Sequence, residues 1–416
     1  MRSRNIVIIV VVSCAVIALA GAATVRLIYS VATGRIFGYE PPQTPAQLKE
    51  ARIVVGQDFL ARSEFVKTGL LETIGGIGNI SDVAVGEFDS HPSLDVVVAG
   101  HEGALVLDRN GVRQSQILFQ FRTSNVKIGP LTTPRIEQSL GDVQVIDLEG
   151  DGICEYLARG SLDGAAVFDH EGKLLWTYGK HTKEKVFINN LTTGDLDGDG
   201  VAEFVVSWYG IEVFDKSGKR RSQVVEEYGD TQIEVVDIDG DGKNEIVSVG
   251  GTLKIRDATG QVVKEVDVPG YFGNFALCNM PGRKEPVILA VHDSSLLLVD
   301  FNGTTAAQFA APLSEFNDTV SKMPTGEEFH GTSVYKSKGV WIKLANDRPE
   351  YLAVINEFAA IDRSVLDVFT PKGELVYQEV LPEECSSIAV LPSADPSGVE
   401  ELLVGGSRTV WRYRIR

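Results

Sequence analysis

Three short acidic segments of the chain share one spacing of oxygen-bearing side chains. Each has an acid at positions 1, 3 and 5, a glycine at position 6 and a glutamate at position 9. Acids at alternate positions of a tight loop point to one side, and they form the set of hard oxygen ligands that Ca²⁺ takes. The predicted metal ligands are Asp147, Glu149, Asp151 and Glu155; Asp195, Asp197, Asp199 and Glu203; and Asp237, Asp239, Asp241 and Glu245.

Two weaker copies of this pattern flank the three strong ones. The first lacks the glycine and the second carries fewer charges, so we favour simple strand-joining turns for both over metal sites. Their candidate ligands are Glu87, Asp89 and Asp95 in the first copy, and Ser393, Asp395, Ser397 and Glu401 in the second.

An EF-hand shares the first positions of this spacing but needs a bidentate glutamate at position 12 and a helix on each side. Position 12 of the three strong copies is Ala158, Val206 and Ser248, and none of these is an acid. The segments that follow the loops are short and rich in β-branched residues, which indicates strands. The loops are therefore expected to join strands.

The bulk composition narrows the classes of function. The chain has 416 residues and a formal net charge of −18, which disfavours nucleic acid as a partner and suits several divalent-cation sites. Its four cysteines are too few for a disulfide framework, and we expect them to be buried thiols. The six histidines show no metal-ligand spacing, so the chain is not predicted to be an enzyme.

The N-terminus carries a nearly unbroken apolar run from Asn5 to Val25, preceded by Arg2 and Arg4. About 20 such residues span a bilayer, so residues 1–30 are predicted to form a membrane anchor, with a cleaved signal peptide as the alternative. Both place the rest of the chain outside the cytoplasm, and cleavage would make it secreted. Residues 31–63 are expected to be a proline-containing linker.

Residues 64–416 are built from repeats. Six turns with aspartate or threonine first and glycine fourth mark β-hairpins, at Asp108–Gly111, Asp169–Gly172, Asp215–Gly218, Asp257–Gly260, Asp300–Gly303 and Thr370–Gly373. Acids that open a second strand recur seven times, and Glu203, Glu245 and Glu285 are 42 and 40 residues apart. Four-stranded units at this period predict an all-β fold, a seven-bladed β-propeller.

The last repeat ends at the C-terminus without its fourth strand. An unpaired edge would invite aggregation, so another segment is expected to cover it. The alternating stretch from Phe65 to Leu71 precedes the first repeat and is predicted to supply the missing strand. Two long intervals, Arg113 to Gln138 and Pro312 to Lys338, exceed what a blade needs and are candidate binding loops.

From about Ile80 to Arg416 the loops and strands together resemble the FG-GAP and VCBS repeats, the β-propellers related to the integrin alpha-chain N-terminal domain. The loops that begin at Asp195 and Asp237 are the most specific part of the resemblance. It implies that Ca²⁺ is bound between strands of a blade. The Phe-Gly and Gly-Ala-Pro sequences of that class are absent, so recognition of integrin-like ligands is not implied.

The predicted function is an interaction or adhesion scaffold outside the cytoplasm, anchored in the membrane and bound to Ca²⁺, with an unidentified protein or glycan as partner. One alternative is a carbohydrate-binding propeller, with rings such as Trp208, Tyr209, Tyr271 and Phe272 stacking on sugars. A second alternative is a polysaccharide-processing enzyme, although the loops already account for most of the clustered carboxylates.

Overall fold

The structure is a computed structural model, and every secondary-structure element named for its described residues is a β-strand. No described residue lies in a helix long and apolar enough to cross a membrane. The predicted N-terminal helix and most of the linker lie outside the described residues. The described residues are 52–54, 65–71, 76–86, 94–119, 123–128, 131–136, 140–148, 151, 153–160, 165–178, 190–226, 232–249, 252–268, 275–292, 295–310, 321–322, 328–329, 334–344, 349–358, 363–394 and 398–415.

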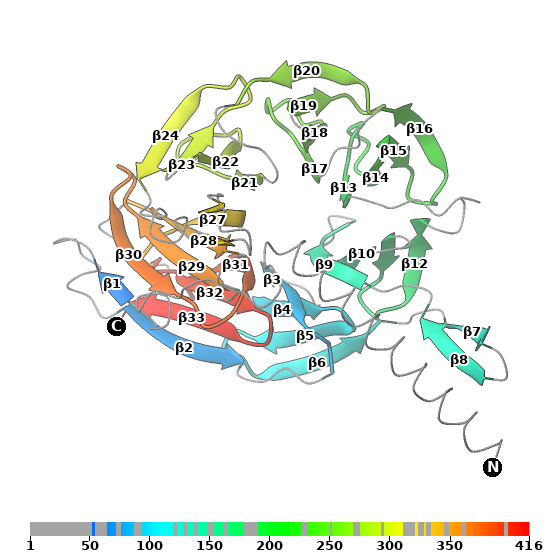
Figure 1. The fold of residues 1–416 in the computed structure, drawn as a ribbon, viewed down its shortest axis with the longest axis horizontal. Coiled ribbons are helices and arrows are strands. Elements are labelled where there is room, and N and C mark those ends of the chain that lie inside the picture. The colour runs from blue at the N-terminus through cyan, green and yellow to red at the C-terminus, as the bar shows by residue number, and fades with distance from the viewer. Residues whose placement is uncertain are drawn as a thin grey trace, which may run out of the picture.

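Seven antiparallel sheets of the described residues stand around a ring, which confirms the predicted seven-bladed β-propeller (Figure 1). Blades one to six follow one another in chain order. Blade one contains β3 (Ile80–Gly86), β4 (Asp95–Gly100), β5 (Gly103–Asp108) and β6 (Arg113–Leu118). Blade two contains β9 (Leu140–Ile146), β10 (Glu155–Gly160), β11 (Ala165–Phe168) and β12 (Leu174–Thr177). Blade three contains β13 (Asn190–Gly194), β14 (Glu203–Trp208), β15 (Gly210–Phe214) and β16 (Arg220–Val225).

The remaining blades follow the same order, with the first strand innermost in the ring (Figure 1). Blade four contains β17 (Gln232–Val236), β18 (Glu245–Val249), β19 (Leu253–Arg256) and β20 (Val262–Val266). Blade five contains β21 (Ala276–Cys278), β22 (Val287–His292), β23 (Ser295–Val299) and β24 (Thr305–Ala310). Blade six contains β27 (Val334–Ile342), β28 (Tyr351–Phe358), β29 (Arg363–Phe369) and β30 (Leu375–Val380).

Blade seven closes the ring with strands from both ends of the described chain. It contains β31 (Cys385–Leu391), β32 (Glu401–Gly406), β33 (Val410–Ile415) and β2 (Phe65–Leu71). Strand β2 pairs antiparallel with β33, from Phe65 opposite Ile415 to Leu71 opposite Val410. The prediction that Phe65–Leu71 supplies the missing strand is therefore confirmed, and the pairing covers the edge that β33 would leave open.

A short strand of the linker also joins the ring. Strand β1 (Arg52–Val54) pairs with β30, with Arg52 opposite Glu379 and Val54 opposite Tyr377, so the sheet of blade six has a fifth strand. The stretch 31–63 was expected to be a spacer, and no pattern in it predicted this pairing. The outer edge of blade six is thus covered, as Figure 1 shows beside β30.

The two long intervals contain small hairpins in addition to blade strands. The first includes β6 and the hairpin of β7 (Thr123–Ile128) and β8 (Leu131–Ile136), which lies outside the ring between β6 and β9 (Figure 1). The second contains the short pair β25 (Ser321–Lys322) and β26 (Glu328–Phe329), followed by the start of β27. Their role as binding loops stays a prediction.

The six predicted hairpin turns have the expected hydrogen bonds. In blade three the amide of Gly218 donates to the carbonyl of Asp215 at 2.8 Å, and one Asp215 carboxylate oxygen accepts from the amides of Ser217 and Lys219. Gly218 has a φ of 81°, a left-handed conformation that favours glycine. The same bond from the fourth residue to the first occurs in all six turns, which confirms their type.

The core consists of apolar layers between neighbouring blades. In β14 the side chains of Phe204 and Val206 pack into the layer shared with blade two, whereas Val205 packs into the layer shared with blade four. Because alternate residues of a strand point to opposite faces, a strand buried on both faces is continuously apolar. Cys154, Cys278 and Cys385 are buried and free, as expected, and burial raises the pKa of Cys154 to about 11.

Candidate metal centre

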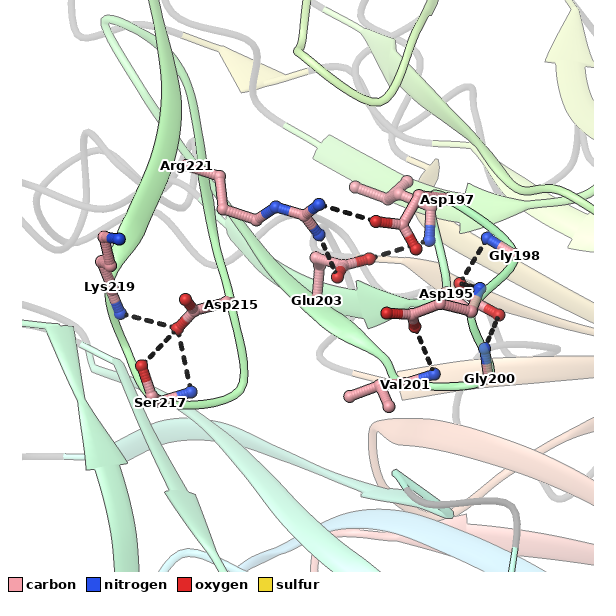
Figure 2. Close-up of polar contacts among 12 residues, drawn as sticks. Asp195, Asp197, Gly198, Gly200, Val201, Glu203, Asp215, Ser217, Lys219 and Arg221 are labelled. Atoms are coloured by element: carbon pink, nitrogen blue, oxygen red, sulfur yellow. Dashed lines mark hydrogen bonds and ion pairs between the residues drawn. The ribbon is translucent and has the colours of Figure 1, made fainter.

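The blade-three loop runs from Asp195 at the end of β13 to Glu203 at the start of β14, and its own backbone holds its acids in place. One carboxylate oxygen of Asp195 accepts from the amide of Gly198 at 2.7 Å, and the other accepts from the amide of Gly200 at 2.8 Å (Figure 2). Gly198 and Gly200 have φ values of 77° and 82°, which bend the chain around the carboxylate. The loop is therefore a compact turn with its first acid at the centre.

Two further acids of this loop, Asp197 and Asp199, lie close to Asp195. One carboxylate oxygen each from Asp195, Asp197 and Asp199 lies within 4.8 Å of the other two. Two oxygens on opposite sides of Ca²⁺ are about 5 Å apart, since each Ca–O distance is about 2.3–2.6 Å. The donor set consists of hard oxygens only and the spacing matches, so these residues fit a calcium ion.

The blade-four loop between β17 and β18 repeats this geometry with one difference. The two Asp237 oxygens accept from the amides of Gly240 and Gly242, at 2.6 and 2.9 Å. The carboxylate oxygens that lie within 4.8 Å of one another belong to Asp237, Asp239 and Glu245. The ninth-position glutamate is thus part of the cluster in blade four, whereas it is absent from the cluster in blade three.

The blade-two loop is described only in part, because Glu149 lies outside the described residues. An Asp147 oxygen accepts from the amide of Asp151 at 3.2 Å, and Asp147 and Asp151 are both exposed. Glu155 is buried and accepts from the amide of Leu148 at 2.9 Å. The Asp147 bond has a counterpart in blade three, where Asp195 accepts from the amide of Asp199, whereas in blade four the amide of Asp241 donates to Asp239. Among the described residues no third acid joins Asp147 and Asp151.

One hydrogen bond is common to the three loops. The ninth-position glutamate accepts from the amide of the second-position residue, at 2.9, 3.0 and 3.2 Å. This bond fastens the start of each loop to the strand that follows it. The pairs are Leu148 with Glu155, Leu196 with Glu203, and Ile238 with Glu245.

The weak copies have little in common with the strong ones. Glu87, Asp89, Asp395 and Ser397 lie outside the described residues. Asp95 is buried at the start of β4, and Glu401 forms an ion pair with Arg412 of β33. Ser393 is half-buried. In the described part of the chain, neither weak copy brings three acidic side chains close enough to one another to hold an ion.

The electrostatics of the loops follow from burial and from close like charges. Burial raises the pKa of Glu203 and of Glu245, and the neighbouring carboxylates of Asp239 and Asp241 raise the pKa of Glu245 further. Burial also acts on Asp237, but the amides of Gly242 and Gly240 hold the pKa of that carboxyl below its usual range. In blade four the first acid, Asp237, is thus stabilised as an anion, whereas the ninth acid, Glu245, is destabilised as one.

Sequence reasoning missed Arg221, a basic residue of β16 that reaches the blade-three loop. Its guanidinium donates to Asp197 at 2.6 Å and to Glu203, as Figure 2 shows. The hydrogen bond from Arg221 lowers the pKa of Asp197. Arg221 is 24 residues from Asp197, and only the pairing of β15 with β16 brings the two together. The sequence feature that could have indicated this contact is the basic residue shortly after the hairpin turn.

The aromatic residues that were expected to stack on sugars differ in their exposure and in whether the structure describes them. Tyr209 is 60% exposed, and its ring stands edge-on to that of half-buried Trp208, with 6.2 Å between ring centroids. Tyr271 and Phe272 lie outside the described residues. Among the residues whose exposure the structure describes, Tyr209 is the one exposed aromatic side chain, and it has no exposed aromatic partner for stacking.

Comparison with known proteins places the chain in the class of seven-bladed β-propellers. The structure of BBS1N, solved in complex with ARL6DN, aligns with a TM-score of 0.52 and 10% identity, over 85% of this chain and 97% of that chain. The structure of streptogramin B lyase aligns with a TM-score of 0.52 and 9% identity, over 85% and 98% of the two chains. No protein-family model and no curated protein matches the sequence. At such identities the likeness concerns the fold alone.

Proposed function

We propose that the chain is a non-enzymatic β-propeller of the FG-GAP and VCBS type, stabilised by Ca²⁺, that acts as a protein-interaction or adhesion scaffold. The observation that carries this proposal is the gathering of carboxylates in two neighbouring loops. A turn that only joins strands needs one acid at its first position. Three carboxylate oxygens within 4.8 Å repel one another, and a divalent cation would turn that repulsion into attraction.

The metals would act as structural staples in this proposal. Asp237 directly follows β17 and Glu245 opens β18, so an ion held by both would fix the connection between the first two strands of blade four. Calcium modules outside the cell have dissociation constants of roughly 10⁻⁴ to 10⁻³ M. Such sites are filled where calcium is plentiful, which suits a chain held outside the cytoplasm by its apolar segment Asn5 to Val25.

Surface composition supports the scaffold role. All large apolar side chains that are exposed among the described residues belong to blades one to four. They are Val112, Leu118, Leu175, Val201, Tyr209, Val225, Val262 and Val263. Where such side chains lie close together, they favour contact with another protein. The BBS1N propeller was solved in a complex with ARL6DN, and we propose that this chain likewise binds a protein.

A thermal melt tests the stapling role. The full chain should unfold at a higher temperature in about 2 mM Ca²⁺ than in excess chelator, because a site with a dissociation constant of about 10⁻⁴ M then adds about 2 kcal/mol. The double variant Asp195→Ala with Asp237→Ala should lose most of this difference. Glu171→Ala, which removes an exposed acid outside the loops, should retain it. Equal midpoints with calcium and with chelator would refute the proposal.

A further inference from the structure

A one-residue bulge occurs at the same place in blades one to six, where the fourth strand leaves its hairpin turn. In blade three, Phe214 pairs with Arg220 and Val213 pairs with Ser222, so Arg221 is left without a partner in the ladder. A bulge bends the strand and re-aims the extra side chain. The residues at this position are Gln114, Leu175, Arg221, Val263, Ala306 and Val376. Arg221 is the one charged residue among them.

The bulge directs Arg221 into the acidic loop of its own blade. One guanidinium nitrogen lies 2.6 Å from an oxygen of Asp197, and another donates to Glu203 (Figure 2). These acids are the third and ninth positions of the loop. Glu203 is 3% exposed, whereas Arg221 is 42% exposed. The guanidinium thus approaches from the solvent side and binds two of the acids that a metal would use.

Blade four offers the natural comparison. Its bulge residue is Val263, which is 61% exposed and has no charge. There the ninth-position Glu245 lies with Asp237 and Asp239 in the cluster of carboxylate oxygens. In blade three the matching Glu203 is bound by Arg221 and does not belong to the cluster. The clusters have three acids in both blades, and the presence of the arginine coincides with the exchange of the ninth acid for the fifth, Asp199.

We infer that Arg221 is an internal competitor for the divalent cation in blade three, so that blade four holds the tighter of the two sites. The inference rests on the proposed calcium binding. An ion that takes Asp197 and Glu203 as ligands must displace the guanidinium from both, and the positive charge of Arg221 also repels an approaching cation. Without metal, Arg221 neutralises part of the loop and keeps it ordered. Blade four has no such substitute among the described residues and depends on the ion.

Calcium titration calorimetry on full-length variants with one intact loop tests this inference. The first variant, Asp147→Asn with Asp237→Asn, keeps only the blade-three loop intact. The second variant, Asp147→Asn with Asp195→Asn, keeps only the blade-four loop intact. Adding Arg221→Val to the first chain should raise its calcium affinity roughly tenfold, because the metal no longer has to replace two ion pairs. Adding Val263→Arg to the second should lower its affinity by a similar factor. Lys219→Val, which removes an exposed cation two residues away, should change the affinity less than twofold.

The outcomes separate the inference from the proposal on which it depends. Unchanged affinities in both exchanges, or an equal rise with Lys219→Val, would overturn the role of Arg221 while leaving calcium binding intact. If no chain binds calcium, including the one without substitutions, the proposed function fails and the inference fails with it. Val263 is exposed, so the exchange in blade four tests the inference even where loss of Arg221 disturbs folding around buried Glu203.

Discussion

Asn244 of the blade-four loop donates its side-chain amide to the main-chain carbonyl of Asp195 in the blade-three loop, at 2.7 Å. Its backbone amide donates to the same oxygen at 3.3 Å. Asn244 is the eighth residue of its loop, and Asp195 is the first residue of the neighbouring loop. The eighth residue of the blade-three loop is Ala202, which has no side-chain donor for blade two. The two loops that gather carboxylates are therefore joined directly.

This contact predicts a measurable loss of stability when the side-chain donor is removed. Asn244→Ala should lower the free energy of unfolding by about 1 kcal/mol, the usual contribution of one hydrogen bond between partly buried groups. The measurement is urea unfolding followed by circular dichroism. Asn110→Ala, in an exposed hairpin turn of blade one, is the matched control and should have a smaller effect. Equal stability of the Asn244 variant and the unsubstituted chain would show that the contact contributes nothing.

A buried glutamate, bound by a lysine and two tyrosine hydroxyls, stabilises the closure of the ring. Glu379 of β30 is 1% exposed and accepts from Lys67 of β2 at 2.9 Å. It also accepts from the hydroxyls of Tyr377 and Tyr413, at 2.7 and 2.9 Å. The glutamate of blade six is thereby bound to both the N-terminal and the C-terminal strand of blade seven.

Neutralising this glutamate should weaken the closure of the ring. Glu379→Gln leaves the Lys67 ammonium without its partner in a mostly buried position, which costs about 3 kcal/mol. Thermal unfolding should shift to lower temperature by several degrees, whereas Glu374→Gln, on an exposed turn before the same strand, should have little effect. Amide exchange should also accelerate in β2 and β33 before the other blades. A variant as stable as the unsubstituted chain would contradict this account of the closure.

Asp367 of β29 predicts a pH dependence of stability. Burial raises the pKa of this carboxyl to about 7, although Gln378 and Asn356 each donate a hydrogen bond to it at 2.8 Å. The folded chain then keeps a proton that the unfolded chain releases near pH 4. The contribution of Asp367 to stability is therefore fully present below about pH 4 and is lost as pH rises toward 7.

The Asp367→Asn variant isolates this contribution. Between pH 5 and pH 8 the unsubstituted chain should lose roughly 2 kcal/mol more stability than the variant, because asparagine does not titrate. Urea unfolding at both pH values measures the difference. A difference of the opposite sign, with the unsubstituted chain gaining stability relative to the variant at pH 8, would mean that Asp367 is held as a stabilised anion.

The sequence was sufficient for features that depend on local chemistry. The hairpin turns follow from aspartate and glycine at fixed positions, and the loop acids follow from their spacing. The closing strand Phe65–Leu71 was predictable because an incomplete last repeat requires a partner and this segment alternates correctly.

Features that depend on strand register could not be predicted in this way. Strand β1 has only 3 residues, and its stretch carries no period that would mark a strand. Arg221 reaches the blade-three loop because a bulge shifts it out of the ladder, and Asn244 reaches Asp195 because two blades are neighbours. Such long-range pairings are set by the closed ring, so the difference between the two carboxylate clusters emerged only from the structure.

The amount of calcium bound per chain tests the central claim most directly. The full chain is dialysed to equilibrium against about 2 mM Ca²⁺, and bound metal is measured by elemental mass spectrometry. The account predicts about one bound ion for each intact loop, with the loss of one ion in Asp237→Ala and none in Glu171→Ala. Protein that binds no calcium above the buffer level, or that binds the same amount after Asp195→Ala with Asp237→Ala, would contradict the assignment of these loops as metal sites.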